Sequence, residues 1–291
     1  IVLPRQADAP ATVFEFLVGH FTQVTAEQWQ QRIIDGKVHW QDGQLIELTT
    51  PYRPATRVYY YREVSHEKKI PFAEQILYQD EYKIIVVKPH FLPVTPSGHF
   101  VNECLVQRLR IATGIETIAP AHRLDRDTAG VMLMTVQPET RHRYHELFAK
   151  GRIHKRYHAL AKLTPPLLQQ YQQGELVLPY SVTVKNRLQK STPSFLMQIV
   201  EGENNSHSEI SLVAVKGDIG LFELSPITGK THQLRMHMLS LGMPLINDRF
   251  YPELQPKTED DFERPLQLMA RSLEFTEPMT NQPHFFEVDG L

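Results

Sequence analysis

The sequence contains a single cysteine, Cys104, among 291 residues. One thiol excludes a disulfide framework and any zinc site built from several cysteines, and it is typical of a reducing cytoplasm. No apolar run approaches the roughly 20 residues of a membrane-spanning helix, and the first residues lack the basic and apolar regions of a secretion signal. We therefore expect a cytoplasmic protein with no membrane association.

The sequence also lacks a marked excess of either positive or negative charge. The 31 Lys and Arg residues nearly balance the 33 Asp and Glu residues, which gives a formal net charge of −2. Nucleic-acid-binding proteins are usually more basic than this. The charges are unevenly spread, however: residues 141–157 hold six bases and one acid, and residues 252–291 hold nine acids and three bases. The basic segment is either a surface for a polyanion or a solvated helix face.

Residues 1–71 have the pattern of a small α+β unit. Apolar residues at helical spacing predict a first helix, and Thr25-Ala26-Glu27-Gln28 matches the capping box that begins a second one. The Asp42-Gly43 turn between two apolar runs predicts a hairpin. The polar residues 65–70 are expected to link this unit to a larger domain over 72–291. The predicted elements of the unit are helices over 12–20 and 25–35, a hairpin over 38–48 and a strand over 57–64.

Residues 72–291 are long enough to enclose one large hydrophobic core. Their predicted strands do not alternate regularly with helices, which favours an α+β fold over a doubly wound parallel sheet. Residues 186–210 are polar, contain Asn204-Asn205-Ser206 and are expected to hold a loop or an insertion. The predicted strands lie at 76–78, 84–87, 131–134, 157–161 and 221–224, and the predicted helices at 103–113, 141–149 and 232–241.

Two polar motifs lie about a hundred residues apart in the larger domain. His122-Arg123-Leu124-Asp125-Arg126-Asp127-Thr128-Ala129-Gly130 leads into a buried strand, and Gly229-Lys230-Thr231-His232-Gln233-Leu234-Arg235 begins a helix. A carboxylate at the edge of a core is costly to bury unless a cation pairs with it. We therefore expect Arg235 to be the partner of Asp125, because a guanidinium holds a carboxylate ionised and fixes its direction.

Together, these motifs resemble the signatures of the RluA-type pseudouridine synthases, a family of RNA-modifying isomerases. Lys88-Pro89 and Arg156-Tyr157-His158-Ala159-Leu160 resemble two further segments of that family, and the likeness covers most of residues 76–280. The resemblance implies that residues 72–291 form the catalytic domain. Its expected fold is the pseudouridine synthase fold, a bent, mostly antiparallel mixed sheet flanked by helices.

The N-terminal unit is similar to the small S4-like RNA-binding module that precedes the catalytic domain in many such synthases. Its spacing of Trp29, Arg32, Ile33 and Gly36-Lys37-Val38 carries this likeness. The segment 1–71 holds eight bases and eight acids, without the excess of positive charge that favours RNA binding. It is therefore either an RNA-contacting module or a structural cap on the larger domain.

Pseudouridine formation breaks the N1–C1′ bond of uridine, turns the free ring and joins C5 to C1′. Because it involves neither redox change nor net hydrolysis, we expect no cofactor and no metal. The resemblance implies that Asp125 is the catalytic carboxylate, as nucleophile at C1′ or as base at C2′. It places Tyr157 and Arg235 in the same catalytic site. Tyr157 would stack on the uracil and orient the carboxylate or the sugar; otherwise it is a core aromatic residue.

The family flips its target nucleotide out of the helix, because the glycosidic bond cannot be reached in a stacked, paired base. The arginine of the first motif, here Arg123, is associated with that extrusion; the alternative is a salt bridge to Asp125 or Asp127. Lys230 stands where the family has arginine, which keeps the charge but loses the planar fork. Asn247 stands where a glycine is usual before Asp248. The expected RNA-contacting residues are Arg123, His122, Lys230, Thr231, Gln233, Leu268, Arg152 and Lys155.

The leading prediction is an RNA pseudouridine synthase that acts as a monomer on structured RNA. The S4-like module favours 23S ribosomal RNA over tRNA as substrate. Two alternatives remain: a catalytically silent RNA-binding or ribosome-assembly protein with the same fold, and an unrelated hydrolase built on Asp125 and a histidine. The 14 histidines lack metal-ligand spacing, and base deamination fails because its Cys-x-x-Cys zinc ligands are absent.

Overall fold

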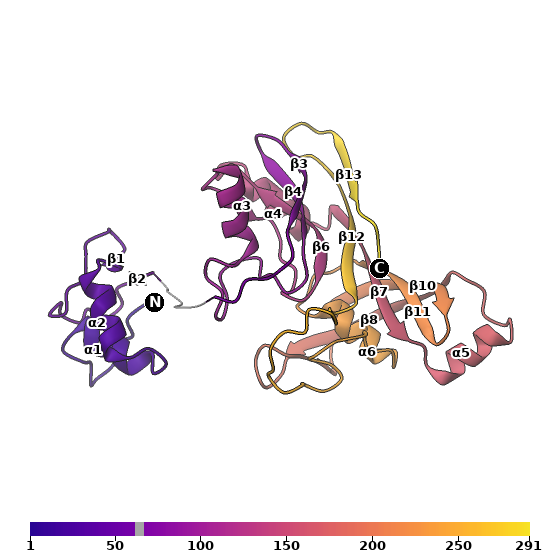
Figure 1. The fold of residues 1–291 in the computed structure, drawn as a ribbon, viewed down its shortest axis with the longest axis horizontal. Helices are drawn as coiled ribbons and strands as arrows, with labels where there is room; N and C mark the ends of the chain where they lie inside the picture. The colour runs from indigo at the N-terminus through magenta and orange to yellow at the C-terminus, as the bar shows by residue number, and fades with distance from the viewer. Residues whose placement is uncertain (62–66) are drawn as a thin grey trace. The chain divides into compact units, whose positions relative to one another are not determined.

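The computed structural model describes residues 1–61 and 67–291, which form two compact units, Ile1–Ser65 and His66–Leu291 (Figure 1). The sequence predicts this division six residues later, between residues 71 and 72. The end of the predicted strand 57–64 and the start of the predicted linker 65–70 lie outside the described residues. None of the helices in the described part of the chain has the length and apolar character to cross a membrane.

The N-terminal unit begins with two capped helices. Thr12 and Thr25 each accept a hydrogen bond from the backbone three residues ahead, and the side chains of Glu15 and Gln28 accept in return from the two threonine N–H groups. Both ends are thus complete capping boxes, as the sequence predicted for the second helix. The elements of the unit are α1 (Val13–His20), α2 (Ala26–Ile34), β1 (Val38–Trp40) and β2 (Val58–Tyr60).

The predicted hairpin over 38–48 forms as a short one. Trp40 N–H donates to the carbonyl of Gln44 at 2.8 Å and Ile46 N–H to that of Val38 at 3.0 Å, with an isolated bridge between His39 and Leu45. Strand β1 also pairs antiparallel with β2, which buries Val58 completely and places the Tyr60 ring 5.1 Å from Trp29. Residues 45–48 therefore return along β1 as predicted, but they do not continue as a regular strand beyond the bridge.

The second unit is built on an eleven-stranded sheet with the order β3-β4-β6-β12-β7-β11-β10-β8-β9, in which β13 pairs with β12 and β5 with β6. Every pairing is antiparallel except that of β6 with β12. The predicted α+β class with a mixed, mostly antiparallel sheet is confirmed. The strands are β3 (Gln75–Gln79), β4 (Lys83–Lys88), β5 (Ala119–Pro120), β6 (Ala129–Thr135), β7 (Ile153–Lys162), β8 (Tyr180–Lys190), β9 (Met197–Val200), β10 (Ser206–Lys216), β11 (Ile219–Pro226), β12 (Leu268–Thr276) and β13 (Pro283–Glu287).

Helices cover both faces of the sheet around β4 and β6. Met132 and Met134 of β6 share a core with α3 (Leu105–Thr113), and Val131 and Leu133 share another with α4 (Arg141–Ala149). Because successive strand residues point to opposite faces, a strand covered on both sides is apolar throughout. All seven residues of β6 are accordingly buried. The two remaining helices are α5 (Pro165–Gln172) and α6 (Gln233–Ser240).

The one parallel contact of the described sheet brings the start of β6 against β12. Gly130 has a φ of +115°, and a Cβ there would lie 2.1 Å from the carbonyl oxygen of Ala270. Only glycine permits this approach. Ala270 is in turn the register partner of Tyr157 on β7. The close packing at Gly130 thus brings the loop before β6 alongside Leu268 and Tyr157.

The polar segment 186–210 holds two loops, 191–196 and 201–205, the second of which contains Asn204 and Asn205. The rest of the segment is the end of β8, all of β9 and the start of β10, and Asn186 pairs with Ser206 in the register of β8 and β10. These strands were not predicted because this part of the sheet buries few side chains: only Val184 and Leu188 are buried along the eleven residues of β8. A half-exposed antiparallel strand has too little apolar sequence to be distinguished from a loop.

Candidate active site

A cleft of about 910 Å³ opens where three segments of the second unit meet. Its walls are the loop 120–128 before β6, the end of α4 with the start of β7, and the loop 226–232 before α6. Of the predicted site residues, only Arg152 lies outside this lining. The other ten line it: Asp125, Tyr157, Arg235, Arg123, His122, Lys230, Thr231, Gln233, Leu268 and Lys155.

The charges of the cleft are strongly biased. Among the described residues that line it, Asp125 is the only carboxylate, whereas Arg123, Lys155, Lys230 and Arg235 are cations. The net charge of −2 for the whole chain therefore hides a positive cleft. A concave surface with an excess of cations attracts a polyanion.

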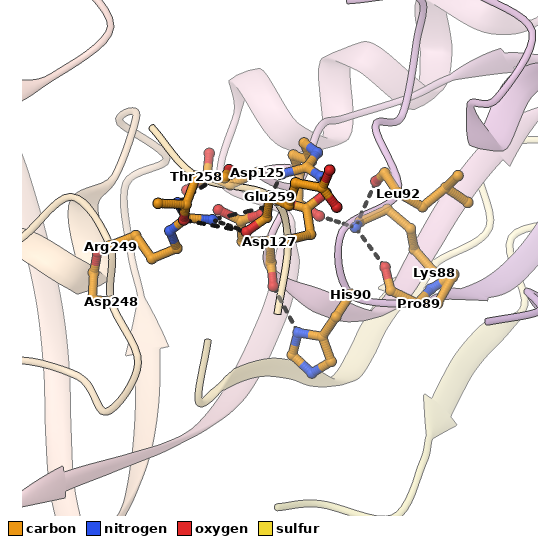
Figure 2. Close-up of polar contacts among 12 residues, drawn as sticks. Lys88, Pro89, His90, Leu92, Asp125, Asp127, Asp248, Arg249, Thr258 and Glu259 are labelled. Carbon is orange, nitrogen blue, oxygen red and sulfur yellow. Dashed lines mark hydrogen bonds and ion pairs between the residues drawn. The ribbon is translucent and has the colours of Figure 1, made fainter. Parts of the chain in front are cut away.

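The buried side chain of Lys88 holds the loop that carries Asp125. Lys88 Nζ donates to the carbonyl oxygens of Pro89 (2.8 Å), Leu92 (2.9 Å) and Arg126 (2.9 Å), as Figure 2 shows. Thr128 N–H closes the turn on the carbonyl of Asp125 at 3.1 Å. Burial lowers the pKa of Lys88 to about 7. The Asp125 backbone is thus held on both sides.

Two carboxylates share the guanidinium of Arg235 on α6. Nε and Nη2 donate to Asp248 at 2.8 and 2.5 Å, while Nη1 lies 3.5 Å from Oδ2 of Asp125. The Asp248 side chain is 1% exposed and that of Asp125 is 31% exposed. Burial alone would lower the pKa of Arg235, but the bonds and charge of Asp248, and then Asp125, raise it above its ordinary value. Arg235 therefore contacts Asp125, as expected, but its principal partner is Asp248.

Asp248 contacts Arg235 at the site, an interaction that the sequence did not indicate. Its carboxylate also accepts from the backbone N–H groups of Phe250 (2.9 Å) and Tyr251 (3.1 Å). The preceding Asn247 has a φ of +62°, a left-handed conformation that asparagine tolerates better than most residues. This explains why asparagine can replace the usual glycine there. No spacing rule connects Asp248 with Arg235, which is 13 residues earlier.

His232 is the second group that faces Asp125. Its Nε2 lies 3.8 Å from Asp125 Oδ2, and its Nδ1 lies 2.7 Å from the hydroxyl of Tyr251. That hydroxyl also accepts from Met197 N–H at 2.8 Å, so the ring orientation is fixed by a partner that is itself held in place. Burial lowers the pKa of His232. The neutral ring therefore faces Asp125 with its Nε2 edge; the sequence motif contained His232 without indicating this role.

Tyr157 lies on β7 as a buried side chain of the cleft. Burial and the charge of Asp125 raise its pKa, so the phenol is neutral at physiological pH. Among the described residues, its hydroxyl makes no hydrogen bond to Asp125. The ring and Leu268 both face the cleft from neighbouring strands. Together they form an apolar surface beside the carboxylate.

Arg123 and His122 are adjacent in sequence but differ in their surroundings. Arg123 is exposed and has no ion-pair or hydrogen-bond partner among the described residues; Asp127 pairs with Arg126 instead, at 3.2 Å. His122 Nε2 accepts the N–H of Leu133 at 3.1 Å. Burial, with a contribution from Lys155, lowers the pKa of His122 to about 3. Arg123 is available to a ligand, whereas His122 helps to hold the loop against β6.

Gln233 has no group left for RNA. Its Nε2 donates to the carbonyl of His207 (3.0 Å) and to Ser208 Oγ (2.9 Å), and its Oε1 accepts from Thr228 Oγ1 (2.7 Å) and Lys230 N–H (3.0 Å). An amide has two donors and two acceptor positions. The structure thus differs from the RNA contact expected for Gln233, which instead holds the loop 228–230 on β10.

The described residues contain no cluster of three or more His, Cys, Asp or Glu side chains that could hold a metal ion. A neutral histidine, a partly exposed carboxylate and several cations are what the cleft offers. These groups suit proton transfer or nucleophilic attack on a bound polyanion.

Comparisons with known proteins agree with this geometry. A sequence model of the RNA pseudouridylate synthase family matches residues 82–240, which include Asp125, Tyr157 and Arg235. The chain is 31% identical over 228 residues to tRNA pseudouridine synthase C of Vibrio parahaemolyticus, across 73% of this chain and 88% of that protein. It is 32% identical over 184 residues to ribosomal large subunit pseudouridine synthase C of Buchnera aphidicola, across 62% of this chain and 55% of that protein.

The fold is also found among solved structures. Human RNA pseudouridylate synthase domain containing 1 aligns with a TM-score of 0.59 over 77% of this chain and 86% of that chain. The identity is 20%, so this likeness concerns the fold alone.

Proposed function

The chain belongs to the RluA-type family of RNA pseudouridine synthases, and we propose that Asp125 is the carboxylate with which this isomerase attacks or deprotonates the ribose of a flipped-out uridine. The observation that carries the proposal is the environment of this side chain. Its Oδ2 faces Arg235 and His232, whereas its Oδ1 has no partner among the described residues and lies in a positively charged cleft.

Two routes fit this arrangement. As a nucleophile, Asp125 bonds to C1′ while the N1–C1′ electron pair leaves with the uracil; the ring turns, C5 bonds to C1′, and the carboxylate departs. As a base, Asp125 removes the proton from C2′ as the N1–C1′ bond breaks, and returns it after C5 has bonded to C1′. In either route C5 finally loses its hydrogen. Arg235 orients the carboxylate and moderates its charge, and the neutral His232 ring limits where its Oδ2 can move.

The other cleft residues would hold the substrate. Tyr157 and Leu268 provide an apolar surface for the uracil ring, to which the neutral phenol adds a stacking face. Arg123, exposed and without a partner, fills the space that the extruded base leaves or binds a neighbouring phosphate. Lys155 at the start of β7 and Lys230 in the loop 226–232 add positive charge to the other two walls.

For the substrate, we propose ribosomal RNA as the first pool to test, because the N-terminal unit has the helical pattern predicted to be S4-like. The relatives' names point both ways: one names tRNA and the other the large ribosomal subunit. The S4-like identity of residues 1–71 stays a prediction. Tritium release from tRNA alone would overturn the choice of ribosomal RNA without affecting the role of Asp125.

The test is tritium release from RNA labelled with 5-³H-uridine, with separate ribosomal RNA and tRNA pools. We expect release by the wild type and a loss of at least about 10³-fold for Asp125→Asn, because the amide is neither a nucleophile nor a base. Asp127→Asn is the matched control: Asp127 lies in the same loop but does not line the cleft, so it should retain activity within a few-fold.

Two results would contradict the proposal. Full release by Asp125→Asn would remove this carboxylate from the reaction. No release from any pool by a folded wild-type protein that still binds RNA would point to a silent RNA-binding protein. Thermal unfolding of each variant would show whether a loss of activity reflects a loss of fold.

A further inference from the structure

A second groove, of about 760 Å³, adjoins the cleft. It is formed by α4, by the start of β7 and by the end of β12 with the turn that follows it, residues 276–281. Gly151 lines both the cleft and the groove, so the two hollows adjoin at this residue. A Cβ at Gly151 would meet nothing within 4 Å, and glycine leaves that space open. The groove also contains Arg152, the one predicted RNA contact that lies outside the cleft.

The guanidinium groups of this groove form no close ion pair among the described residues. Arg143 and Arg152 are both exposed, and neither side chain has an ion-pair or hydrogen-bond partner there; the charge of Glu146 acts on Arg152 only from beyond ion-pair distance. The two acids of the groove are already paired. Glu146 binds Lys150 at 3.0 Å, and the buried Glu277 accepts from Tyr144 and lies 2.6 Å from Lys83. Two guanidinium groups with unused donors thus remain.

We propose that this α4–β7 groove binds the phosphodiester backbone of the RNA stem that flanks the target nucleotide. The inference rests on the proposed function, because it extends the same RNA from the cleft across Gly151. Planar guanidinium groups bind phosphate through two parallel hydrogen bonds. Contacts of this kind fix the register of an RNA without reading its sequence. The groove would therefore position the stem, while the cleft selects the uridine.

The test compares Arg143→Gln/Arg152→Gln with Arg156→Gln. Arg156 is an exposed cation of the same segment, but it lies 3.9 Å from Glu223 and does not line the groove. Once the modified uridine has been located, two synthetic hairpins are used, one with a short stem and one with a long stem. Kd is measured against NaCl concentration, and tritium release gives kcat and KM.

We expect the double variant to bind the long-stem hairpin roughly tenfold more weakly and to lower its salt slope by about two, since each lost phosphate contact removes about 0.9 from the slope. Its kcat, and its KM for the short-stem hairpin, should match those of the wild type. Arg156→Gln should change neither slope nor KM. Thermal unfolding should show the same stability for all three proteins, because none of the replaced groups is buried.

An unchanged salt slope in the double variant would overturn the proposal, as would equal losses on both hairpins or an equal effect of Arg156→Gln. Failure of the proposed function has a different signature. In that case the wild type would release no tritium from any RNA. The salt slope of binding to a generic long-stem RNA would still report whether the two arginines contact phosphate.

Discussion

Asp248 and Asp125 contact the same guanidinium from different parts of the chain, and they differ in almost every other respect. Asp248 receives two short bonds from Arg235 and two more from backbone N–H groups. Asp125 lies on a loop that lines the cleft, has one contact of 3.5 Å with Arg235, and its Oδ1 has no hydrogen-bond partner among the described residues. One carboxylate is saturated with hydrogen bonds and the other is not.

The difference distinguishes a carboxylate that supports the site from one that is suited to react. A carboxylate whose oxygens accept four hydrogen bonds has little tendency to attack a carbon or remove a proton. By binding Nε and Nη2, Asp248 fixes the plane of the guanidinium, so that Nη1 is the nitrogen offered to Asp125. Asp248 is thus a positioning residue that acts through Arg235, whereas Asp125 is the group available to substrate.

The largest effect is expected from Asp248→Asn. The change leaves the buried Arg235 without its principal counter-charge, so we expect the free energy of unfolding to fall by about 3–5 kcal/mol. Urea unfolding of the full chain measures this. Asp218→Asn removes an exposed pair with Lys162 at 3.3 Å and should change stability by less than about 1 kcal/mol. If Asp248→Asn were as mild as this control, the supporting role of Asp248 would be wrong.

The elements around this ion pair were largely predictable from sequence. The apolar run at 131–134 indicated the buried strand β6, and periodicity indicated α4 and α6 to within a few residues. The meeting of Asp125 with Arg235 followed from the family resemblance and from the need of a carboxylate for a cation. Each of these features rests on a local pattern or on a motif, which the sequence displays directly.

The sequence did not show which of several possible partners a buried polar group binds in the folded chain. Arg235 has two carboxylates within reach, and only the folded loop after α6 shows that Asp248 takes the larger share. The bonds of the Gln233 amide to His207 and Ser208, and the pairing of β1 with β2, likewise come from segments distant in sequence. No local pattern of residues reports such partners.

An intermediate effect on stability is expected from His237, which lies two residues after Arg235 on α6. Burial, with a smaller contribution from His207, lowers the pKa of His237 to about 4. The unfolded chain therefore binds a proton near pH 6.5 that the folded chain refuses until about pH 4, so stability is lost as pH falls through that interval. At pH 5 the loss is about 2 kcal/mol.

His237→Gln tests this contribution, because glutamine can still bond to Ser206 and Asn186, the partners of His237 Nε2 at 3.1 and 3.2 Å. The variant should lose less stability between pH 7 and pH 5 than the wild type does, by about 2 kcal/mol. His145→Gln, an exposed histidine of α4, should leave the pH dependence unchanged. Parallel curves for the wild type and His237→Gln would show that the buried ring does not control acid stability.

The smallest effect on stability is expected from the residue with the largest effect on catalysis. Asp125→Asn removes a charge that is 31% exposed and has one long contact with Arg235, so the free energy of unfolding should change by less than about 0.5 kcal/mol. The same isosteric change on the other side of the guanidinium, Asp248→Asn, provides the comparison by urea unfolding. A cost of several kcal/mol for both variants would mean that the two carboxylates support the fold equally. We expect only Asp248→Asn to lose stability and Asp125→Asn to lose tritium release. That pair of results would show that Asp248 holds the site and that Asp125 acts in it.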